Sequence, residues 1–266
     1  MIRVAVIGCG YWGPNLVRNF SALPDTEIRV ICDRDETRAR DVGHRFPAAR
    51  LETDAYAAIA ADDVDAVAVA TPVQYHYPLA RAALESGKHV LVEKPLTDSV
   101  KTARVLVDLA EERGLVLQVD HTFVYSGAVK KLKSIVDSGE MGDLLYVDCV
   151  RINLGLFQSD VNVIWDLAPH DVSIVLHLID RPPVWVSAIG CAHYGKLESQ
   201  AYVTIKFDHS LIAHLHVNWL APVKIRSTLI GGSKRMLVYD DLEPSEKVRV
   251  YDKGVTLNEP DLRHEA

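Results

Sequence analysis

The first 120 residues alternate short apolar runs with stretches of helical spacing. The near-continuous apolar runs are residues 2–7, 28–32, 66–70, 89–92 and 115–119. Apolar residues at helical spacing occur in residues 14–23, 36–45, 77–86 and 99–113. Strands buried on both faces are apolar throughout, and helices that cross between parallel strands cover those faces. The pattern therefore predicts an α/β domain built on a parallel sheet.

The pattern changes after residue 143. A further helical pattern covers residues 126–139, and another covers residues 170–178. Strand-like segments then follow one another with short polar turns, at residues 144–152, 184–192, 201–207, 211–219 and 224–230. This order predicts an α+β C-terminal domain with a largely antiparallel open sheet. We place the two domains at residues 1–121 and 122–266.

Composition narrows the class of partner. The 266 residues carry a formal net charge of −7, which argues against a nucleic-acid partner held by phosphate contacts. No apolar run approaches the roughly 20 residues that span a bilayer, and the chain starts directly with a strand instead of a signal peptide. We expect a soluble cytoplasmic protein with no membrane partner. The four cysteines are scattered, so we expect free thiols and no metal site.

A glycine motif follows the first strand. The segment VAVIGCGYWGPNL carries Gly8, Gly10 and Gly13 in G-x-G-x-x-G spacing and leads into a helix. In this context the first glycine allows a tight turn, the second lets a pyrophosphate approach the backbone, and the third allows close helix–strand packing. The helix N-terminus offers unpaired N–H groups to the phosphates. The first domain is therefore predicted to be a dinucleotide-binding Rossmann domain.

An acidic residue at the end of the second strand bears on the choice of cofactor. Asp33 lies 20 residues beyond Gly13, where a carboxylate accepts hydrogen bonds from the adenosine ribose. It would repel a 2′-phosphate, so NAD is favoured over NADP. Arg34 and Arg38 are either solvated helix-start residues or partners of such a phosphate.

The fifth strand ends in Glu93, Lys94 and Pro95. Ligands of open α/β sheets lie beyond the carboxyl ends of the strands. Lys94 at this end could donate to a substrate hydroxyl, or take part in proton transfer if burial lowers its pKa. Pro95 fixes the turn, and Glu93 is a candidate partner for a cation. Glu93 and Lys94 are also candidates for the cofactor site, where Lys94 could touch the nicotinamide ribose.

Five other residues are candidates for the cofactor site. Thr71 and Pro72 end the fourth strand, where we expect them to line the crevice for the nicotinamide and its ribose. His76 either reaches the cofactor or starts a helix at the surface. Tyr11 and Trp12 in the glycine loop either cover the pyrophosphate or serve packing alone.

The Glu-Lys-Pro triplet after an N-terminal glycine motif resembles the Gfo/Idh/MocA oxidoreductases. The resemblance extends over ATPVQYHYPLA, LQVDHTFVYSGAVKKLKSIVDSGEMGDL and WDLAPHDVSI. It implies that Lys94 is catalytic and that Asp166 and His170, which match a D-x-x-x-H pattern, supply polar groups at the substrate. It also implies inositol, amino-sugar or nucleotide-sugar substrates. Dimers or tetramers packed through the C-terminal sheet are a further implication.

His170 is the best candidate to move a proton, because imidazole titrates near neutral pH. A core histidine is the alternative. Asp166 lies four residues earlier, on the same face if the segment is helical. It either orients His170 or binds a neighbouring hydroxyl, and Asp171 is the alternative orienting carboxylate.

Further substrate candidates are His121, Arg151 and Asn153, for each of which a structural role is the alternative. Asp120 stands where similar sequences often have glycine. The chain ends at Ala266 with the polar, loop-like NEPDLRHEA, whereas relatives continue with a further helix and strand. Either the sequence is truncated or the second domain is reduced.

These observations predict an NAD-dependent oxidoreductase that transfers a hydride between a secondary hydroxyl of a sugar, nucleotide sugar or cyclitol and the nicotinamide. Two alternatives stay open: an eliminase or dehydratase that uses NAD transiently, and a non-catalytic NAD-binding sensor. The residues expected at a subunit interface are Trp185, Val203, Ile205, His214, His216 and Trp219.

Overall fold

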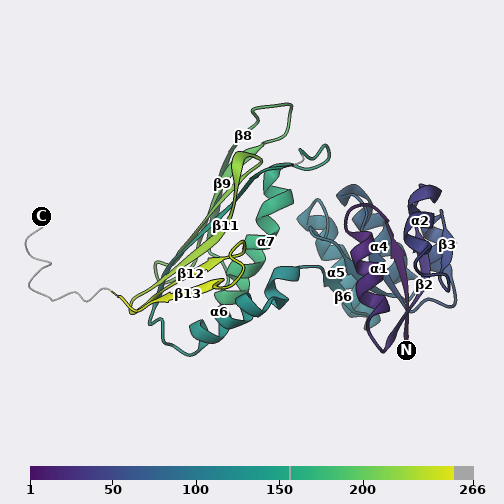
Figure 1. The fold of residues 1–266 in the computed structure, drawn as a ribbon, viewed down its shortest axis with the longest axis horizontal. Coiled ribbons are helices and arrows are strands. Elements are labelled where there is room, and N and C mark those ends of the chain that lie inside the picture. The colour runs from purple at the N-terminus through teal and green to yellow at the C-terminus, as the bar shows by residue number, and fades with distance from the viewer. Residues whose placement is uncertain (156, 255–266) are drawn as a thin grey trace, which may run out of the picture. The chain divides into compact units, whose positions relative to one another are not determined.

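The computed structural model describes residues 1–155 and 157–254. The chain forms two compact units, which divide between Asp120 and His121. Each unit has its own sheet and hydrophobic core (Figure 1). The C-terminal segment 255–266, for which a loop was expected, lies outside the described residues.

The first unit contains a six-stranded parallel sheet in the order β3-β2-β1-β4-β5-β6. Its strands are β1 (Ile2–Ile7), β2 (Thr26–Cys32), β3 (Arg50–Glu52), β4 (Ala66–Val69), β5 (His89–Val92) and β6 (Leu117–Val119). The strand order reverses beside β1, whose neighbours are β2 and β4. In a doubly wound sheet, this reversal is where a crevice for a ligand opens.

Helices follow the strands of this sheet. They are α1 (Gly13–Ser21), α2 (Glu36–Gly43), α3 (Ala55–Ala60), α4 (His76–Glu85) and α5 (Val100–Arg113), with a short 3-10 helix η1 (Val73–Tyr75). Side-chain caps begin several of them: Ser99, for example, accepts a hydrogen bond from the Thr102 amide at 3.2 Å. Alternate residues of β1 enter two different cores, with Val4 and Val6 in one and Ala5 and Ile7 in the other. Both faces of the sheet are therefore covered, as the apolar strands predicted.

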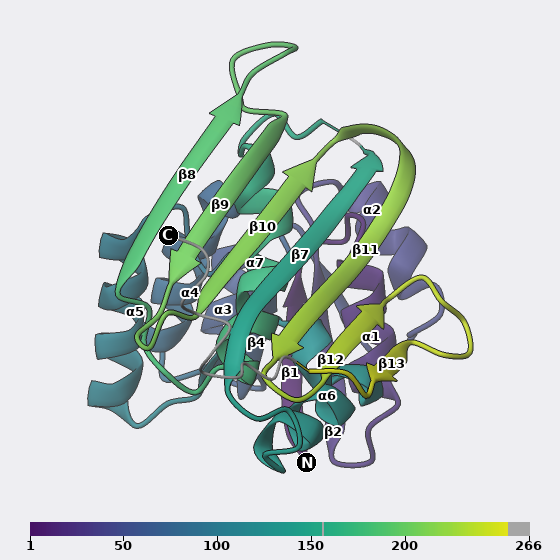
Figure 2. The same ribbon diagram turned by 90° about the vertical axis from the view of Figure 1, so that its left-hand side faces the viewer.

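The second unit contains a seven-stranded sheet in the order β13-β12-β11-β7-β10-β9-β8. Its strands are β7 (Leu144–Leu154), β8 (Trp185–Cys191), β9 (Gln200–Lys206), β10 (Ile212–Asn218), β11 (Leu220–Gly232), β12 (Met236–Asp240) and β13 (Val248–Tyr251). All neighbours are antiparallel except β7 and β10, which run parallel. The largely antiparallel sheet was predicted, although β12 and β13 were not (Figure 2).

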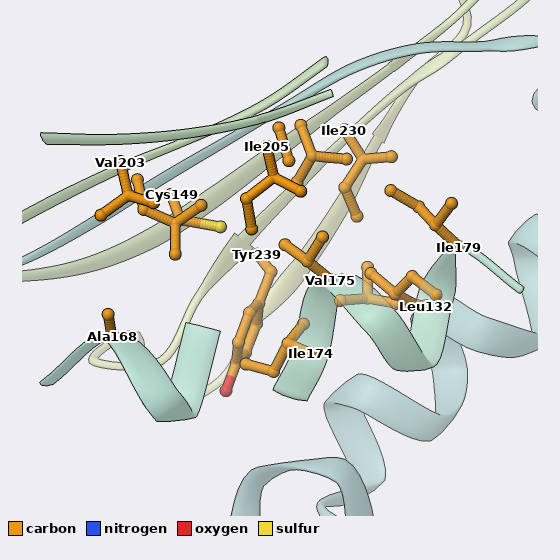
Figure 3. Close-up of a cluster of buried hydrophobic side chains, with 14 of the residues drawn as sticks. Leu132, Cys149, Ala168, Ile174, Val175, Ile179, Val203, Ile205, Ile230 and Tyr239 are labelled. Atoms are coloured by element: carbon orange, nitrogen blue, oxygen red, sulfur yellow. The ribbon is translucent and has the colours of Figure 1, made fainter. Parts of the chain in front are cut away.

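Two helices, α6 (Gly127–Asp137) and α7 (Val163–Leu178), pack against one face of this sheet, and a 3-10 helix η2 (Thr122–Tyr125) precedes them. Side chains of the strands, such as Val203 and Ile205, point from the sheet toward α7, with Val203 above Ala168 and Ile205 above Val175 (Figure 3). Helix α7 begins seven residues earlier than predicted. The Asn162 side chain caps it, and Pro169 lies inside it.

The opposite face of the second sheet carries no helix in the described part of the chain (Figure 2). Because successive strand residues alternate between faces, Ala213, Leu215 and Val217 enter the core whereas His214 and His216 lie on the open face. The interface set expected from the sequence is therefore partly wrong. Val203, Ile205 and Trp219 belong to the buried core, and only Trp185, His214 and His216 share the open face.

Candidate active site

The glycine loop between β1 and α1 is shaped by backbone contacts. Gly8 has a φ of +99°, and a Cβ there would lie 2.5 Å from the Ala70 carbonyl oxygen at the end of β4. A Cβ on Gly13 would lie 1.8 Å from the carbonyl oxygen of Gly8. These two positions accept only glycine. Gly10 differs, because a Cβ there would meet no atom within 4 Å.

The open space at Gly10 lies in the loop that leads into α1, which begins at Gly13. The first amides of a helix point toward its N-terminus without intrahelical partners, and they carry the positive end of the helix dipole. A phosphate can approach such a backbone where no side chain intervenes. This loop therefore fits the pyrophosphate of a dinucleotide.

Asp33 is fixed at the end of β2 by the backbone around it. Its carboxylate accepts the Cys9 N–H at 2.7 Å and the Asp35 N–H at 2.9 Å, and the residue is 8% exposed. A carboxylate has about four acceptor positions, so two remain for the hydroxyls of a ribose. Arg34 is exposed, and Arg38 lies 3.5 Å from the carboxylate of Asp35.

Tyr11 and Trp12, the two aromatic residues of the glycine loop, differ in their surroundings. Tyr11 is 91% exposed, and its ring lies 6.3 Å from that of Trp12 in a stacked arrangement. The Trp12 indole Nε1 donates to the carboxylate of Asp120 at 3.0 Å. Asp120 follows β6, at the position where similar sequences often have glycine. Trp12 thus connects the glycine loop to the carboxyl end of another strand.

Glu93 and Lys94 follow β5 directly. The Glu93 amide donates to Val69 O and the Asp120 amide to Val92 O, so the parallel ladder continues into these residues. Burial, with the nearby Asp120, raises the pKa of Glu93 to about 9. The neighbouring Lys94 lowers this pKa, and the pairing of Glu93 with a cation stays a prediction. Lys94 itself is half-buried, and its peptide bond to Pro95 is cis.

His76 begins α4, yet it is 1% exposed rather than at the surface. Its Nδ1 lies 2.8 Å from the carbonyl oxygen of Pro95, and its Nε2 lies 2.8 Å from that of Thr71. The imidazole thus ties the end of β4 to the turn after β5. Thr71 is half-buried and Pro72 is exposed at this end of the sheet. The role of His76 visible here is to shape the crevice, with both ring nitrogens facing backbone.

In the second unit, Asp166 and His170 both lie on helix α7. Because they are four residues apart in a helix, they share one face, as predicted for a helical segment. The Asp166 carboxylate accepts a hydrogen bond from the Trp219 indole Nε1 at 3.0 Å. Trp219 is fully buried, so it holds this carboxylate from the core side. His170 is half-buried, and its ring meets that of Phe123 edge-on at 5.0 Å.

Arg151 and Asp171 form a buried ion pair. The Arg151 Nε and a terminal nitrogen contact the carboxylate at 3.0 and 2.7 Å, and both side chains are less than 5% exposed. The guanidinium also lies over the Phe123 ring at 4.6 Å. Structural pairing, the alternative considered for Arg151, is thus present, and Asp171 is committed to Arg151. Asn153 near the end of β7 and His121 after β6 are both half-buried.

Aromatic side chains form a hollow next to the Asp166–Trp219 contact. It measures about 440 Å³ and is lined by Leu154, Phe157, Tyr194 and Leu220. The Phe157 ring lies 5.6 Å from that of Trp219 and 6.1 Å from that of Tyr194. A chain of contacts therefore leads from Asp166 through Trp219 to an apolar, open hollow in the same unit.

Sequence reasoning missed two hydrogen bonds of candidate site residues, those of Trp219 with Asp166 and of Trp12 with Asp120. Trp219 was assigned to a subunit interface, and Asp120 was noted only as a departure from glycine. The partners are 53 and 108 residues apart in the chain, and no local spacing connects them. In residues 1–155 and 157–254, no group of three or more histidine, cysteine or acidic side chains could hold a metal ion.

The doubly wound sheet, its glycine loop and the acidic residue after β2 define a dinucleotide-binding domain of the oxidoreductase class. Two family models match the chain. One is described as "Oxidoreductase family, NAD-binding Rossmann fold" and covers residues 2–121, and the other is the Gfo/Idh/MocA C-terminal domain over residues 129–238. The chain belongs to the Gfo/Idh/MocA oxidoreductase family, whose N-terminal domain binds NAD.

Curated relatives include sugar and cyclitol dehydrogenases. UDP-N-acetylglucosamine 3-dehydrogenase of Acidithiobacillus ferrooxidans is 28% identical over 100% of this chain and 82% of that protein. Inositol 2-dehydrogenase of Mycolicibacterium smegmatis is 35% identical over 68% of this chain. The match spans 53% of that dehydrogenase, about half of its length.

Solved structures agree on the fold. GenD2 from gentamicin A biosynthesis, in complex with NAD, has a TM-score of 0.85 at 30% identity, covering 90% of this chain and 72% of that chain. The Acidithiobacillus ferrooxidans enzyme GnnA has a TM-score of 0.83 at 27% identity, covering 97% and 83%. Among helices of the described residues, none is both long and apolar enough to cross a membrane.

Proposed function

We propose that this protein is an NAD-dependent dehydrogenase that acts on a secondary hydroxyl of a sugar, nucleotide sugar or cyclitol. The observation that carries the proposal is the open backbone at Gly10, at the start of α1 and flanked by the buried Asp33. Family membership and the dehydrogenases among its relatives support the same reaction class. NAD, when bound, supplies the acceptor for the hydride.

Removing a hydride from a carbinol carbon also requires that the hydroxyl proton leave. We propose that Lys94 or His170 takes this proton. Lys94 is held at the carboxyl end of β5, where parallel α/β sheets place their ligands. His170 has an imidazole, which suits proton transfer near neutral pH. The resemblance to the family, as read from the sequence, implies that both lie at the substrate and supports this proposal.

Asp166 is proposed to bind a hydroxyl of the substrate. One oxygen of its carboxylate accepts the Trp219 N–H, which fixes the rotamer of the side chain. A fixed acceptor orients a polyol with less loss of conformational entropy than a mobile one. Asn153 and His121 stay proposals as further substrate contacts.

The aromatic hollow bears on the substrate class. Free sugars and inositols are polar on all sides, whereas Leu154, Phe157 and Tyr194 offer apolar surface. Flat rings stack favourably on aromatic side chains. We therefore favour substrates in which a sugar carries a flat or apolar group, such as a nucleotide sugar, over free cyclitols.

The experiment is a titration of the purified full chain with NAD, followed by a screen for NADH absorbance. The screen contains nucleotide sugars, amino sugars, free sugars and inositols. Net NADH formation with one of these supports the dehydrogenase. Product formed without net NADH identifies an eliminase or dehydratase, and NAD binding without turnover of any compound identifies a sensor.

We also propose that the chain self-associates through the open face of its second sheet. Trp185, Ile189, Tyr202, Ile212 and Tyr146 lie on this face by strand register, and each is more than a third exposed. Large apolar side chains gathered on one exposed face of a sheet are typical of an interaction surface. A second copy, packed face to face, would cover it.

A further inference from the structure

Three polar side chains from distant parts of the first unit form one network. Trp12 comes from the glycine loop, Glu93 follows β5 and Asp120 follows β6. The Trp12 indole donates to one oxygen of Asp120 at 3.0 Å. Glu93 is the neighbour of Asp120 across the two strand ends, because Val92 pairs with Val119 and the Asp120 amide donates to Val92 O. The network therefore connects the cofactor loop to the two strand ends that carry Lys94 and His121.

Two carboxyl groups in contact cannot both be ionised at low cost, because their charges repel and burial weakens solvation. The Glu93 Oε1 is buried and has no hydrogen-bond partner in the described part of the chain. An ionised Glu93 would leave that oxygen charged and unsolvated. One proton on Glu93 relieves the repulsion and supplies the donor that Asp120 can accept.

We propose that Glu93 and Asp120 share one proton and that, with the Trp12 indole, they form a positioning device for the glycine loop. Asp120 bears the single negative charge of the pair and accepts from both neighbours. All three are positioning residues. They hold the glycine loop in place, and Glu93 also fixes the strand end that directly precedes Lys94. The positioning role rests on the proposed function, since the dinucleotide is the ligand of the loop.

The loop is then held at two points by carboxylates on different strands. Asp33 after β2 receives the Cys9 backbone N–H, and Asp120 after β6 receives the Trp12 side chain. Trp12 directly precedes Gly13, where α1 begins. Its placement therefore sets the direction of the first amides of α1, which are the donors available to a pyrophosphate.

The charges around Glu93 set the pH range in which this device holds. Asp120 raises the pKa of Glu93 in addition to the effect of burial, and Lys94 lowers it, with a net result of about 9. Below that pH the pair carries one charge and the network is closed. Above it both carboxylates are ionised, and we expect their repulsion to release Trp12.

The first test is the indole N–H resonance of Trp12 in ¹⁵N-labelled full-length protein without nucleotide. The chain has four tryptophans, and Trp12→Phe identifies the resonance by its loss. We expect a shift with a midpoint near pH 9 in the unchanged protein. Glu93→Gln, whose amide can still donate to Asp120, should keep the resonance near its neutral-pH position and remove the step.

The second test is the dissociation constant of NAD over the same pH range. We expect it to rise at least about threefold between pH 8 and pH 10 in the unchanged protein, as one carboxyl ionises, and to change less in Glu93→Gln. A Trp12 resonance that does not move with pH, or a step that persists in Glu93→Gln, would overturn the proposal. If the Trp12 resonance shifts near pH 9 but the protein does not bind NAD, the shared proton is supported and the proposed function is refuted instead.

Discussion

Asp33 shows how one carboxylate can serve both the fold and the choice of cofactor. Two of its acceptor positions receive backbone N–H groups from Cys9 and Asp35, which anchors the glycine loop to β2. The remaining positions suit the two ribose hydroxyls of NAD, and the negative charge opposes a 2′-phosphate. Arg34 and Arg38 were the two candidates to bind the 2′-phosphate of NADP. Arg38 pairs with Asp35, whereas the exposed Arg34 has no ion pair in the described residues.

Replacing Asp33 by asparagine removes the charge and keeps one of the two backbone contacts. The Asp33→Asn variant would keep a side-chain oxygen for the Cys9 N–H, although its NH2 group cannot accept the Asp35 N–H, and it would lose the charge. We therefore expect the preference for NAD over NADP to fall at least about tenfold, or roughly 1.4 kcal/mol. Calorimetric titration with both nucleotides measures this ratio. Asp54→Asn is the matched control, since Asp54 caps α3 from the exposed side in the same way and has no ion pair with Arg34 or Arg38 in the described residues. An unchanged ratio in Asp33→Asn, or an equal change in the control, would contradict the assignment.

The candidate site residues that could be predicted from the sequence are those whose position follows from nearby residues. The three glycines, Asp33 and Lys94 all follow directly from a strand end, so their places could be predicted once the strands were assigned. The partners of Asp166 and Asp120 could not. Each is a tryptophan from a remote segment, and its indole reaches the carboxylate only because the sheet brings the two segments together.

Helix α7 is fixed to the sheet by the ion pair between Arg151 of β7 and Asp171. Both side chains are almost fully buried, and three hydrogen bonds join them. Removing one partner leaves the other charged without compensation, which is more damaging than replacing both. This pair also lies beside Phe123, against which His170 packs.

We therefore expect Asp171→Ala to lower the free energy of unfolding by about 3–5 kcal/mol. The double replacement Arg151→Met with Asp171→Leu should recover most of that loss, because no buried charge remains. Urea unfolding followed by circular dichroism gives the values. Asp208→Ala is the control, since Asp208 pairs with Arg181 at the surface, and we expect a loss below about 1 kcal/mol. Equal losses at both sites would show that the buried pair has no special role.

Element boundaries show where pattern reasoning stops. Strand β3 has only three residues, Arg50–Glu52, and the sequence contains no apolar run there that would predict a strand. The predicted start of α7 at residue 170 lies directly after Pro169, whereas the helix begins at Val163 and passes through this proline, whose missing N–H removes a single hydrogen bond. The assignment of Val203 and Ile205 to an interface failed for a different reason: the alternation in β9 is visible in the sequence, but which face meets the helices is decided by tertiary packing.

At the scale of the whole molecule, the second sheet has one face buried by α6 and α7 and one face uncovered in the described chain (Figure 2). Tyr202 stacks on His216 at 4.5 Å on the open face, and Thr204 lies 3.1 Å from the Nδ1 of His214. Burial, and the neighbouring His214, lower the pKa of His216. An ordered, partly apolar surface of this kind supports self-association.

A charge on the open face should disrupt that association. We expect light scattering at micromolar concentration to give a dimer or tetramer for the unchanged chain and a smaller species for Ile189→Lys. Val186→Lys is the control, because Val186 is similarly exposed on the same strand but faces the other side of the sheet. A monomeric unchanged chain would contradict the proposal, as would equal dissociation of both variants.

Cofactor binding and proton transfer are assigned to separate residues of the chain, and one paired measurement tests this division most directly. NAD titration and steady-state turnover of the identified substrate are compared for Lys94→Ala and His170→Ala. Lys101→Ala, an exposed lysine on α5, and His177→Ala, about two turns further along α7, are the controls. We predict NAD affinity within a few-fold of the unchanged protein, with only a small extra loss tolerated for Lys94, and turnover lower by roughly 10²-fold or more in both test variants alone. Near-normal turnover in Lys94→Ala and His170→Ala would contradict the account.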